Sequence, residues 1–221
     1  MRLNSKDRKL WWTSDVHHFH KNLCYGESRW GDRETNCRNF ETTKEMSRHM
    51  VEQINKYVEQ DDLLFFLGDW SFGGIDNVWN LRKQLIVKDI IFITGNHDQH
   101  IIKNRILPNC HFDKVSDVTT DGANPNTYGD DRDELFNVEA KQLFTEVHDY
   151  LEVTIDGRTV MLFHRPIEDF HDQRGRVIHL HGHSHGRCPK KPNRLDVGID
   201  NAYLLFGEYK PFTWEEILKY A

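Results

Sequence analysis

The chain has 221 residues, of which 38% are hydrophobic, which is enough for one hydrophobic core, and we expect a single domain over residues 1–221. The net charge of −6 argues against a long nucleic-acid groove, because such grooves need a basic surface. The apolar runs are too short to span a bilayer and the N-terminal stretch lacks a signal-peptide core, so we expect a cytoplasmic protein with no membrane partner.

The first half of the chain alternates predicted strands with predicted helices. The strands of the whole chain are short apolar runs bounded by turn residues, at 9–14, 63–69, 90–96, 150–157, 159–164, 177–182 and 194–200. An apolar face at helical spacing within 41–59 is formed by Met46, Met50, Ile54, Tyr57 and Val58, and a second helix is expected at 77–85. This β-α-β-α-β order predicts a parallel sheet with helices outside it.

The second half has a different pattern. Residues 150–164 predict a hairpin that turns at Asp156-Gly157, and few helical stretches follow before residues 213–221. We therefore expect a second, mostly antiparallel sheet packed on the first, which makes an α/β (α+β) fold. Residues 121–133 are acidic and rich in Gly, Pro and Asn, so a surface insertion is expected there.

The four cysteines do not suggest a metal site or a disulfide framework. No C-x-x-C pair occurs among Cys24, Cys37, Cys110 and Cys188. We expect free thiols at all four positions.

Polar side chains follow five of the seven predicted strands. They are Asp15 and His17; Asp69; Asn96, His97 and Asp98; His164; and His183 and His185. A single Asp or His in such a place is usually a turn residue or a hydrogen-bonded core residue. Five such strand ends are hard to explain in that way, because the ends of parallel strands meet at one edge of a sheet.

The chemistry of this set points to metal ions. Carboxylate and amide oxygens with imidazole nitrogens, and no thiolate, suit Mn²⁺, Fe or Zn²⁺ in a site of high coordination number. If the chain is extended, Asp15 and His17 project to the same side, as do His183 and His185. One carboxylate can hold two ions roughly 3.5 to 4 Å apart, and two such ions acidify a bridging water that can attack phosphorus. The set therefore favours phosphoester hydrolysis.

These motifs resemble a known family. The blocks Asp15-x-His17, Gly68-Asp69, Gly95-Asn96-His97-Asp98, His164 and Gly182-His183-Ser184-His185 resemble the signature of the calcineurin-like metallophosphoesterase superfamily. The wider stretches "TSDVHHFHKN", "LGDWSFGG" and "NRLDVGIDN" are similar to its small single-domain bacterial and phage-type members, over about residues 11–201. The resemblance implies a two-sheet β-sandwich flanked by helices, in a four-layer αββα arrangement.

The resemblance also implies a role for each site residue. It implies two divalent metal ions, with Mn favoured over Fe, Zn, Ni or Mg. The metal ligands would be Asp15, His17 and His185 for the first ion, Asn96, His164 and His183 for the second, and Asp69 as the bridge between them. His97 would protonate the leaving group, and Asp98 would accept a hydrogen bond from the other ring nitrogen of His97.

Substrate contacts are expected from Asn96, from His20 and from Arg165, although a surface or structural role for His20 and a carboxylate partner for Arg165 are equally open. Of the other histidines, His18 and His171 are expected to face solvent. His179 and His181 are expected to be buried and hydrogen-bonded.

The expected function is hydrolysis of a small phosphomonoester or phosphodiester by a metal-bridging hydroxide, with nucleotide derivatives among the candidate substrates. Trp70-Ser71-Phe72 follows Asp69, where the protein serine/threonine phosphatases of the superfamily carry Asp-Arg-Gly, which argues against a protein phosphatase. The alternatives are an inactive scaffold for protein partners, a mononuclear metal-binding regulator or a nuclease. A complete ligand set together with His97 favours catalysis. The ester class, the native metals and the oligomeric state stay open.

Overall fold

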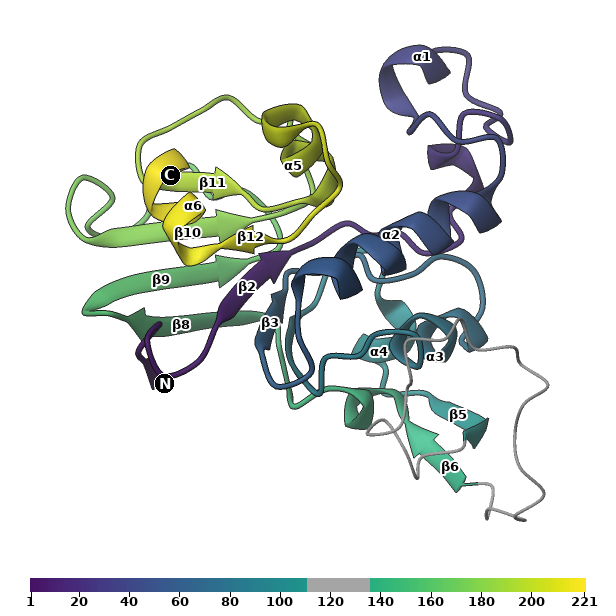
Figure 1. Ribbon diagram of the computed structural model, residues 1–221, viewed down its shortest axis with the longest axis horizontal. Coiled ribbons are helices and arrows are strands. Elements are labelled where there is room, and N and C mark those ends of the chain that lie inside the picture. Colours follow the sequence, from purple (N-terminus) through teal and green to yellow (C-terminus); the bar gives the residue numbers. More distant parts are fainter. Residues whose placement is uncertain (111–135) are drawn as a thin grey trace.

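The computed structural model describes residues 1–110 and 136–221 and contains two five-stranded sheets with helices (Figure 1). The insertion expected at 121–133 lies outside the described residues. The first sheet has the order β12-β2-β3-β4-β7, formed by Phe212–Thr213, Leu10–Thr13, Leu63–Phe66, Asp89–Ile93 and Glu146–His148. The second sheet has the order β1-β8-β9-β10-β11, formed by Arg2–Leu3, Tyr150–Ile155, Arg158–Phe163, Val177–His181 and Arg194–Asp196. β5 (Ile106–Cys110) and β6 (Phe136–Glu139) form a separate antiparallel pair.

The first sheet has the predicted parallel pairing. β2, β3, β4 and β7 are parallel neighbours, and β12 joins β2 in the antiparallel direction. The crossovers carry the two expected helices, α2 (Thr43–Tyr57) and α3 (Asp76–Arg82). α2 begins at Thr42, whose hydroxyl accepts a hydrogen bond from the amide of Glu45. Four of the five predicted apolar residues, Met46, Met50, Ile54 and Val58, are buried and Tyr57 is half-buried, so the periodicity predicted the packed face correctly.

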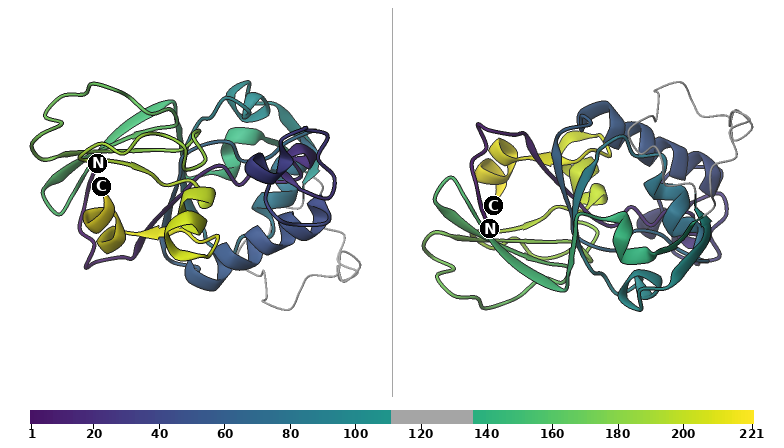
Figure 2. Two further views of the ribbon diagram at one scale, coloured as in Figure 1. Left: turned by 90° about the horizontal axis from the view of Figure 1, so that it is seen from above. Right: turned by 90° about the horizontal axis from the view of Figure 1, so that it is seen from below.

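The first sheet is buried on both faces, as its continuous apolar strands require. Leu64 and Phe66 pack with α2 and α3 in one core, whereas Trp12 and Phe65 face the second sheet in another core. The rings of Trp12 and Phe65 are stacked at 5.2 Å. The second sheet lies to one side of the molecule and helices α2 and α3 to the other (Figure 2).

The second sheet differs from the prediction of a mostly antiparallel sheet. β8 and β9 form the expected hairpin, with Asp156 and Gly157 at φ of 49° and 80°. β1 with β8, β9 with β10 and β10 with β11 are all parallel pairs, however. The segments 164–176 and 182–193 are long enough to return the chain to the starting end of the sheet, which parallel pairing requires.

The remaining helices are short, and only α6 among them was predicted. They are η1 (Lys21–Leu23), α1 (Arg33–Asn36), α4 (Gln99–Ile102), η3 (Ala140–Leu143), α5 (Ile199–Phe206) and α6 (Trp214–Tyr220). The prediction missed α5, because its sequence looks like the end of a strand. It ends at Gly207, whose φ of 74° makes a left-handed cap. No helix in the described part of the chain has the length and apolarity needed to cross a membrane.

Candidate metal centre

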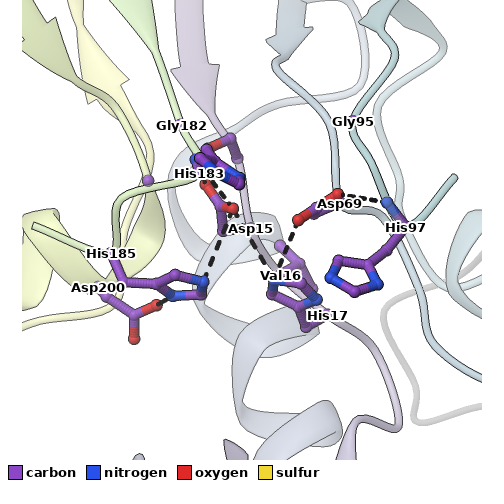
Figure 3. Close-up of polar contacts among 12 residues, drawn as sticks. Asp15, Val16, His17, Asp69, Gly95, His97, Gly182, His183, His185 and Asp200 are labelled. Carbon is purple, nitrogen blue, oxygen red and sulfur yellow. Dashed lines mark hydrogen bonds and ion pairs between the residues drawn. The ribbon is translucent and has the colours of Figure 1, made fainter. Parts of the chain in front are cut away.

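Two groups of metal-capable side chains lie where strands of the two sheets end. The Asp15 cluster consists of Asp15, His17 and His185, and the Asp69 cluster of Asp69, His164 and His183. Within each cluster, one ligand atom from each residue lies within 4.8 Å of the others. Each cluster combines residues that follow strands of the first sheet with residues that follow β9 or β10 of the second (Figure 3). The expected convergence of strand ends is therefore correct.

Asp69 faces histidines of both clusters. Its Oδ2 atom is 3.4 Å from Nε2 of His17 and 3.4 Å from Nε2 of His164. Its Oδ1 atom accepts a hydrogen bond of 2.9 Å from the backbone amide of His97 (Figure 3). One carboxylate oxygen therefore faces a histidine of each cluster, while the second oxygen fixes the side-chain orientation.

Asn96 belongs to the surroundings of the Asp69 cluster. Its Oδ1 atom is 3.1 Å from Nε2 of His164. The other ring nitrogen of His164 lies 2.7 Å from the carbonyl oxygen of Leu67. Because a carbonyl can only accept, Nδ1 of His164 carries a proton and Nε2 is directed at Asp69 and Asn96.

The backbone at the cluster residues is not extended. The sequence had led us to expect an extended chain in which Asp15 and His17, and likewise His183 and His185, project to the same side. Five of the six cluster residues have left-handed φ angles: 57° for Asp15, 50° for His17, 56° for Asp69, 66° for His183 and 49° for His185. Such angles in residues other than glycine cost about 1 to 3 kcal/mol each and gather at functional sites. The turns after β2, β3 and β10 therefore bring their side chains to the site through left-handed residues, whereas His164 after β9 needs none.

Glycines allow these turns to approach one another closely. A methyl group on Gly182 would overlap the hydroxyl of Ser14 and the carboxylate of Asp15, and one on Gly95 would overlap the carboxylate of Asp69. The backbone amide of His183 can then donate to both oxygens of Asp15, at 3.1 and 2.9 Å. Each carboxylate is therefore held by a backbone amide from the turn that follows another strand.

Burial shapes the ionisation of Asp15. This carboxylate is fully buried. Burial raises its pKa to about 7, although the nearby His185 and His164 act in the opposite direction. A buried carboxylate of this kind gains from a cation beside it, because the cation favours the ionised form.

Asp69 and His164 are a coupled pair. Burial opposes ionisation of both, but in Asp69 it is outweighed by the hydrogen bond and charge of His164 and by the charge of His17, which lower the pKa of this carboxylate. Asp69 in turn raises the pKa of His164 to about 9 against the effect of burial. Each partner therefore favours the charged form of the other.

A buried ion pair, not predicted from the sequence, supports His185. The guanidinium of Arg38 donates to both carboxylate oxygens of Asp200 at 2.8 Å, and Asp200 Oδ2 lies 2.6 Å from Nδ1 of His185. This leaves Nε2 of His185 facing Asp15 at 3.9 Å. A carboxylate behind a metal-binding histidine fixes its tautomer and raises its basicity. Arg38 and Asp200 are 162 positions apart, so no local pattern connects them.

His17 gives an independent indication of a bound cation. Both of its ring nitrogens are buried and lack a hydrogen-bond partner among the residues that the structure describes. Buried nitrogens without a partner are rare and need an explanation. With one nitrogen facing both Asp15 and Asp69, at 3.8 and 3.4 Å, the residues present fit a metal ion.

His97 and Asp98 have separate environments. The side chain of His97 is exposed, and its ring centre lies 5.4 Å from that of His17. Asp98 is buried, and its two oxygens accept hydrogen bonds from the backbone amides of Gly95, Asp69 and Trp70 at 2.7, 2.7 and 2.9 Å. The expected bond from the His97 ring to Asp98 is therefore wrong, because the turns around Asp69 and Gly95 supply all the donors that this carboxylate takes.

The predicted substrate contacts lie beside the clusters. Arg165 Nη1 is 3.1 Å from Nε2 of His183, which places the guanidinium at the Asp69 cluster. His20 packs on Phe72 with ring centres 3.9 Å apart and on His17 at 5.3 Å. Burial lowers the pKa of His20 to about 4, so its ring is neutral near pH 7.

Among the other histidines, one prediction is wrong and three are confirmed. His18 does not face solvent: it is 1% exposed and its Nε2 lies 2.8 Å from Asn80 Oδ1, because its backbone forms a bridge with Ser71. His171 is exposed. His179 and His181 are buried, with ring nitrogens near backbone groups of Ile167 and Gly182.

A cavity opens beside His185. Its volume is about 400 Å³. The lining residues are Leu23, Trp30, Gly31, Asp32, Asn36, His185 and Arg187. Arg187 is held there by the carbonyl of Thr35 at 2.7 Å and by Asn36. The cavity joins an aromatic wall to fixed polar groups next to the Asp15 cluster, as small-molecule sites commonly do.

Comparison with known proteins supports the class of fold and does not identify an activity. No known protein-family profile matches the chain. An uncharacterized protein from Methanocaldococcus jannaschii is 29% identical over 102 residues, which are 45% of this chain and 52% of that protein, so the chain spans about half the length of the curated relative it matches. The crystal structure of a protein of unknown function from Aquifex aeolicus is similar with a TM-score of 0.54 and 18% identity, over 96% of this chain and 98% of that chain. This similarity supports the mixed α/β fold.

Proposed function

We propose that the chain is a dinuclear metal-dependent phosphoesterase that hydrolyses a small phosphomonoester or phosphodiester. We assign it to the calcineurin-like metallophosphoesterase superfamily, with the four-layer arrangement of that family. The position of Asp69 carries the proposal. One of its oxygens is 3.4 Å from a histidine of each cluster, and a carboxylate shared by two ions is the central element of a two-metal hydrolase.

The two clusters supply the ligands for the cations. Asp15, His17 and His185 would hold one ion, Asn96, His164 and His183 the other, and Asp69 would contact both. The mixture of oxygen and imidazole ligands favours Mn²⁺, with Fe, Zn²⁺, Ni²⁺ and Mg²⁺ as alternatives. When bound, two such ions would polarise the phosphoryl oxygens and lower the pKa of a water between them.

The other side chains have distinct tasks in this proposal. Arg165, beside His183, binds a phosphoryl oxygen, because a guanidinium presents paired donors to phosphate. His97 protonates the leaving oxygen: its ring is exposed at the opening of the site, and its backbone amide is tied to Asp69. Asp200 and Arg38 keep His185 oriented.

Asp69→Asn tests the proposal. The substitution preserves shape but removes the charge that two cations share. The purified protein is freed of metal with EDTA, reloaded with Mn²⁺ and analysed for metal content and for hydrolysis of p-nitrophenyl phosphate and bis-p-nitrophenyl phosphate. We expect about two Mn²⁺ per wild-type chain, as two clusters imply, EDTA-sensitive turnover, and loss of both metal and turnover in the variant. Asp61→Asn is the matched control, because the Asp61 side chain is 86% exposed and pairs with Lys88 on the surface.

Two outcomes would contradict the proposal. A wild-type chain that binds two ions but hydrolyses neither ester would favour the scaffold alternative. Binding of a single ion, unaffected by Asp69→Asn, would favour the mononuclear regulator.

A further inference from the structure

An aromatic surface borders the site on the side of His97. It consists of His20, Trp30 and Phe72, which we call the aromatic rim. Phe72 and Trp30 are 38% and 39% exposed, so part of each ring is open to a ligand. The rings of both lie against the buried ring of His20, with centres 3.9 and 6.3 Å away. Phe72 also lies 5.5 Å from His97.

The exposed ring of Phe72 is held in place by its backbone. The amide of Phe72 donates to the carbonyl of His18 at 2.8 Å, and its carbonyl accepts from Asn77 Nδ2 at 2.7 Å. The neighbouring Ser71 forms the bridge to His18. Exposed aromatic side chains on mobile loops lose entropy when they bind a ligand, whereas a fixed one is preorganised. This arrangement suits a binding surface.

The chemistry of the aromatic rim is apolar and flat. The His20 ring lies against the ring of Phe72 at the base of the rim, so the rim presents flat ring faces. Trp30 also forms a wall of the cavity of about 400 Å³ next to His185, where Asp32, Asn36 and Arg187 offer hydrogen-bonding groups. Cavities of this size accept small organic ligands. A flat heteroaromatic group can stack on the rings while polar groups contact its edge.

We infer that the aromatic rim binds a nucleobase, so that the substrates of this site are nucleoside phosphoesters rather than phosphoesters of sugars or glycerol. The inference rests on the proposed function and adds the identity of the organic group that the phosphoester substrate carries. The contact between Phe72 and His97 places the base on the leaving-group side, since His97 is the residue proposed to protonate the leaving oxygen.

Matched substrates isolate the contribution of the base. Adenosine 5′-phosphate and ribose 5-phosphate have the same ester oxygen and differ in the base, and their phosphate methyl esters form the corresponding pair of diesters. With the Mn²⁺-loaded protein we expect kcat/KM to be at least about 10-fold higher for the adenosine compound, as stacking of one base allows. Phe72→Ala and Trp30→Ala should each reduce this ratio several-fold, whereas Phe72→Tyr should retain it. Tyr150→Ala on β8 is the control, because Tyr150 is 44% exposed and lies in the second sheet.

A binding measurement separates this inference from the proposed function. Calorimetric titration with adenosine, which has no phosphate, needs no turnover. Adenosine binding that weakens in Phe72→Ala but not in Tyr150→Ala would support the aromatic rim even if no ester were hydrolysed, in which case the proposed function fails alone. Equal kcat/KM for the two compounds of a pair, or adenosine binding that Phe72→Ala leaves unchanged, would overturn the inference and leave the phosphoesterase intact.

Discussion

At the scale of single residues, Asp69 and His97 have complementary positions. Asp69 is 2% exposed and faces both clusters, whereas His97 is exposed and contributes only its backbone amide to Asp69. Metal binding and proton transfer are therefore assigned to different side chains of adjacent turns, and substitutions can separate the two.

His97→Ala is expected to reduce turnover by roughly 10² to 10⁴ while metal content stays at the wild-type level. The reason is that the ring can donate a proton without being a ligand. Turnover of adenosine 5′-phosphate, whose alkoxide leaving group needs a proton, and metal analysis on one preparation provide the check, with His171→Ala as an exposed-histidine control. Loss of metal together with activity would show that His97 is a ligand.

Asp200→Asn is expected to weaken metal binding by about 10- to 100-fold, because it removes the charge that orients and polarises His185. Titration of the metal-free protein with Mn²⁺ measures the effect, and the affinity of one of the two sites, the one that includes His185, should fall. Asp149→Asn provides a control, because Asp149 accepts a hydrogen bond from Thr94 on the surface. Unchanged affinity would show that the link between Arg38, Asp200 and His185 serves stability alone.

At this scale, sequence patterns predict the cluster residues better than the residues that hold them in position. All six cluster residues were predicted, because metal-capable groups directly follow apolar runs and strand ends converge. Arg38 and Asp200 were missed because their pairing depends on tertiary structure. Asp98 was assigned to the wrong partner, because the sequence places it next to His97 but cannot show that three backbone amides surround its carboxylate.

At the scale of elements, the close approach of strand ends determines the site. The turn after β10 contacts the turn after β2 through Gly182, which has room for no side-chain atom between Ser14 and Asp15. The turns after β3 and β4 meet in the same way through Gly95. A substitution that pushes two of these turns apart would therefore displace the cluster side chains without replacing any of them.

Gly182→Ala is therefore expected to reduce metal affinity by at least about 10-fold and to lower the free energy of unfolding by about 1 to 3 kcal/mol, the usual cost of overpacking. Urea unfolding and Mn²⁺ titration measure the two effects. Gly74→Ala is the matched control, since nothing lies within 4 Å of a methyl group there. Wild-type affinity in Gly182→Ala would mean that the turns can separate without loss of the site.

Helices and strands were predicted more reliably than the pairing of the second sheet. The apolar runs and the Asp156-Gly157 turn are local signals, so the strands and the hairpin could be found. The directions of β10 and β11 depend on where the chain returns after 164–176 and 182–193, and long connections carry no such signal.

At the scale of the whole molecule, the clusters join the two sheets. Each cluster combines side chains from turns that follow strands of both sheets, so a cation held there would crosslink layers that otherwise share an apolar core. The buried pair of Arg38 and Asp200 adds a polar link from the start of α5 to the turn after β2.

Mn²⁺ is expected to stabilise the chain through this crosslink. A site with free Mn²⁺ at 100 times its Kd adds about 2.7 kcal/mol to the free energy of unfolding. Thermal unfolding with Mn²⁺ and with EDTA measures the effect, which Asp69→Asn should diminish and Asp61→Asn should preserve. Equal stability under both conditions would contradict a cation bound between the sheets.

The left-handed turns have a consequence for the evolution of this chain. Five of the six cluster positions have a backbone conformation that Gly or Asn adopts at lower cost than His or Asp in general. Selection for heat resistance alone would therefore exchange these positions early and leave the core between the sheets in place. A chain with Asp and His at all five of these positions, in three turns, carries a backbone cost that stability alone does not explain.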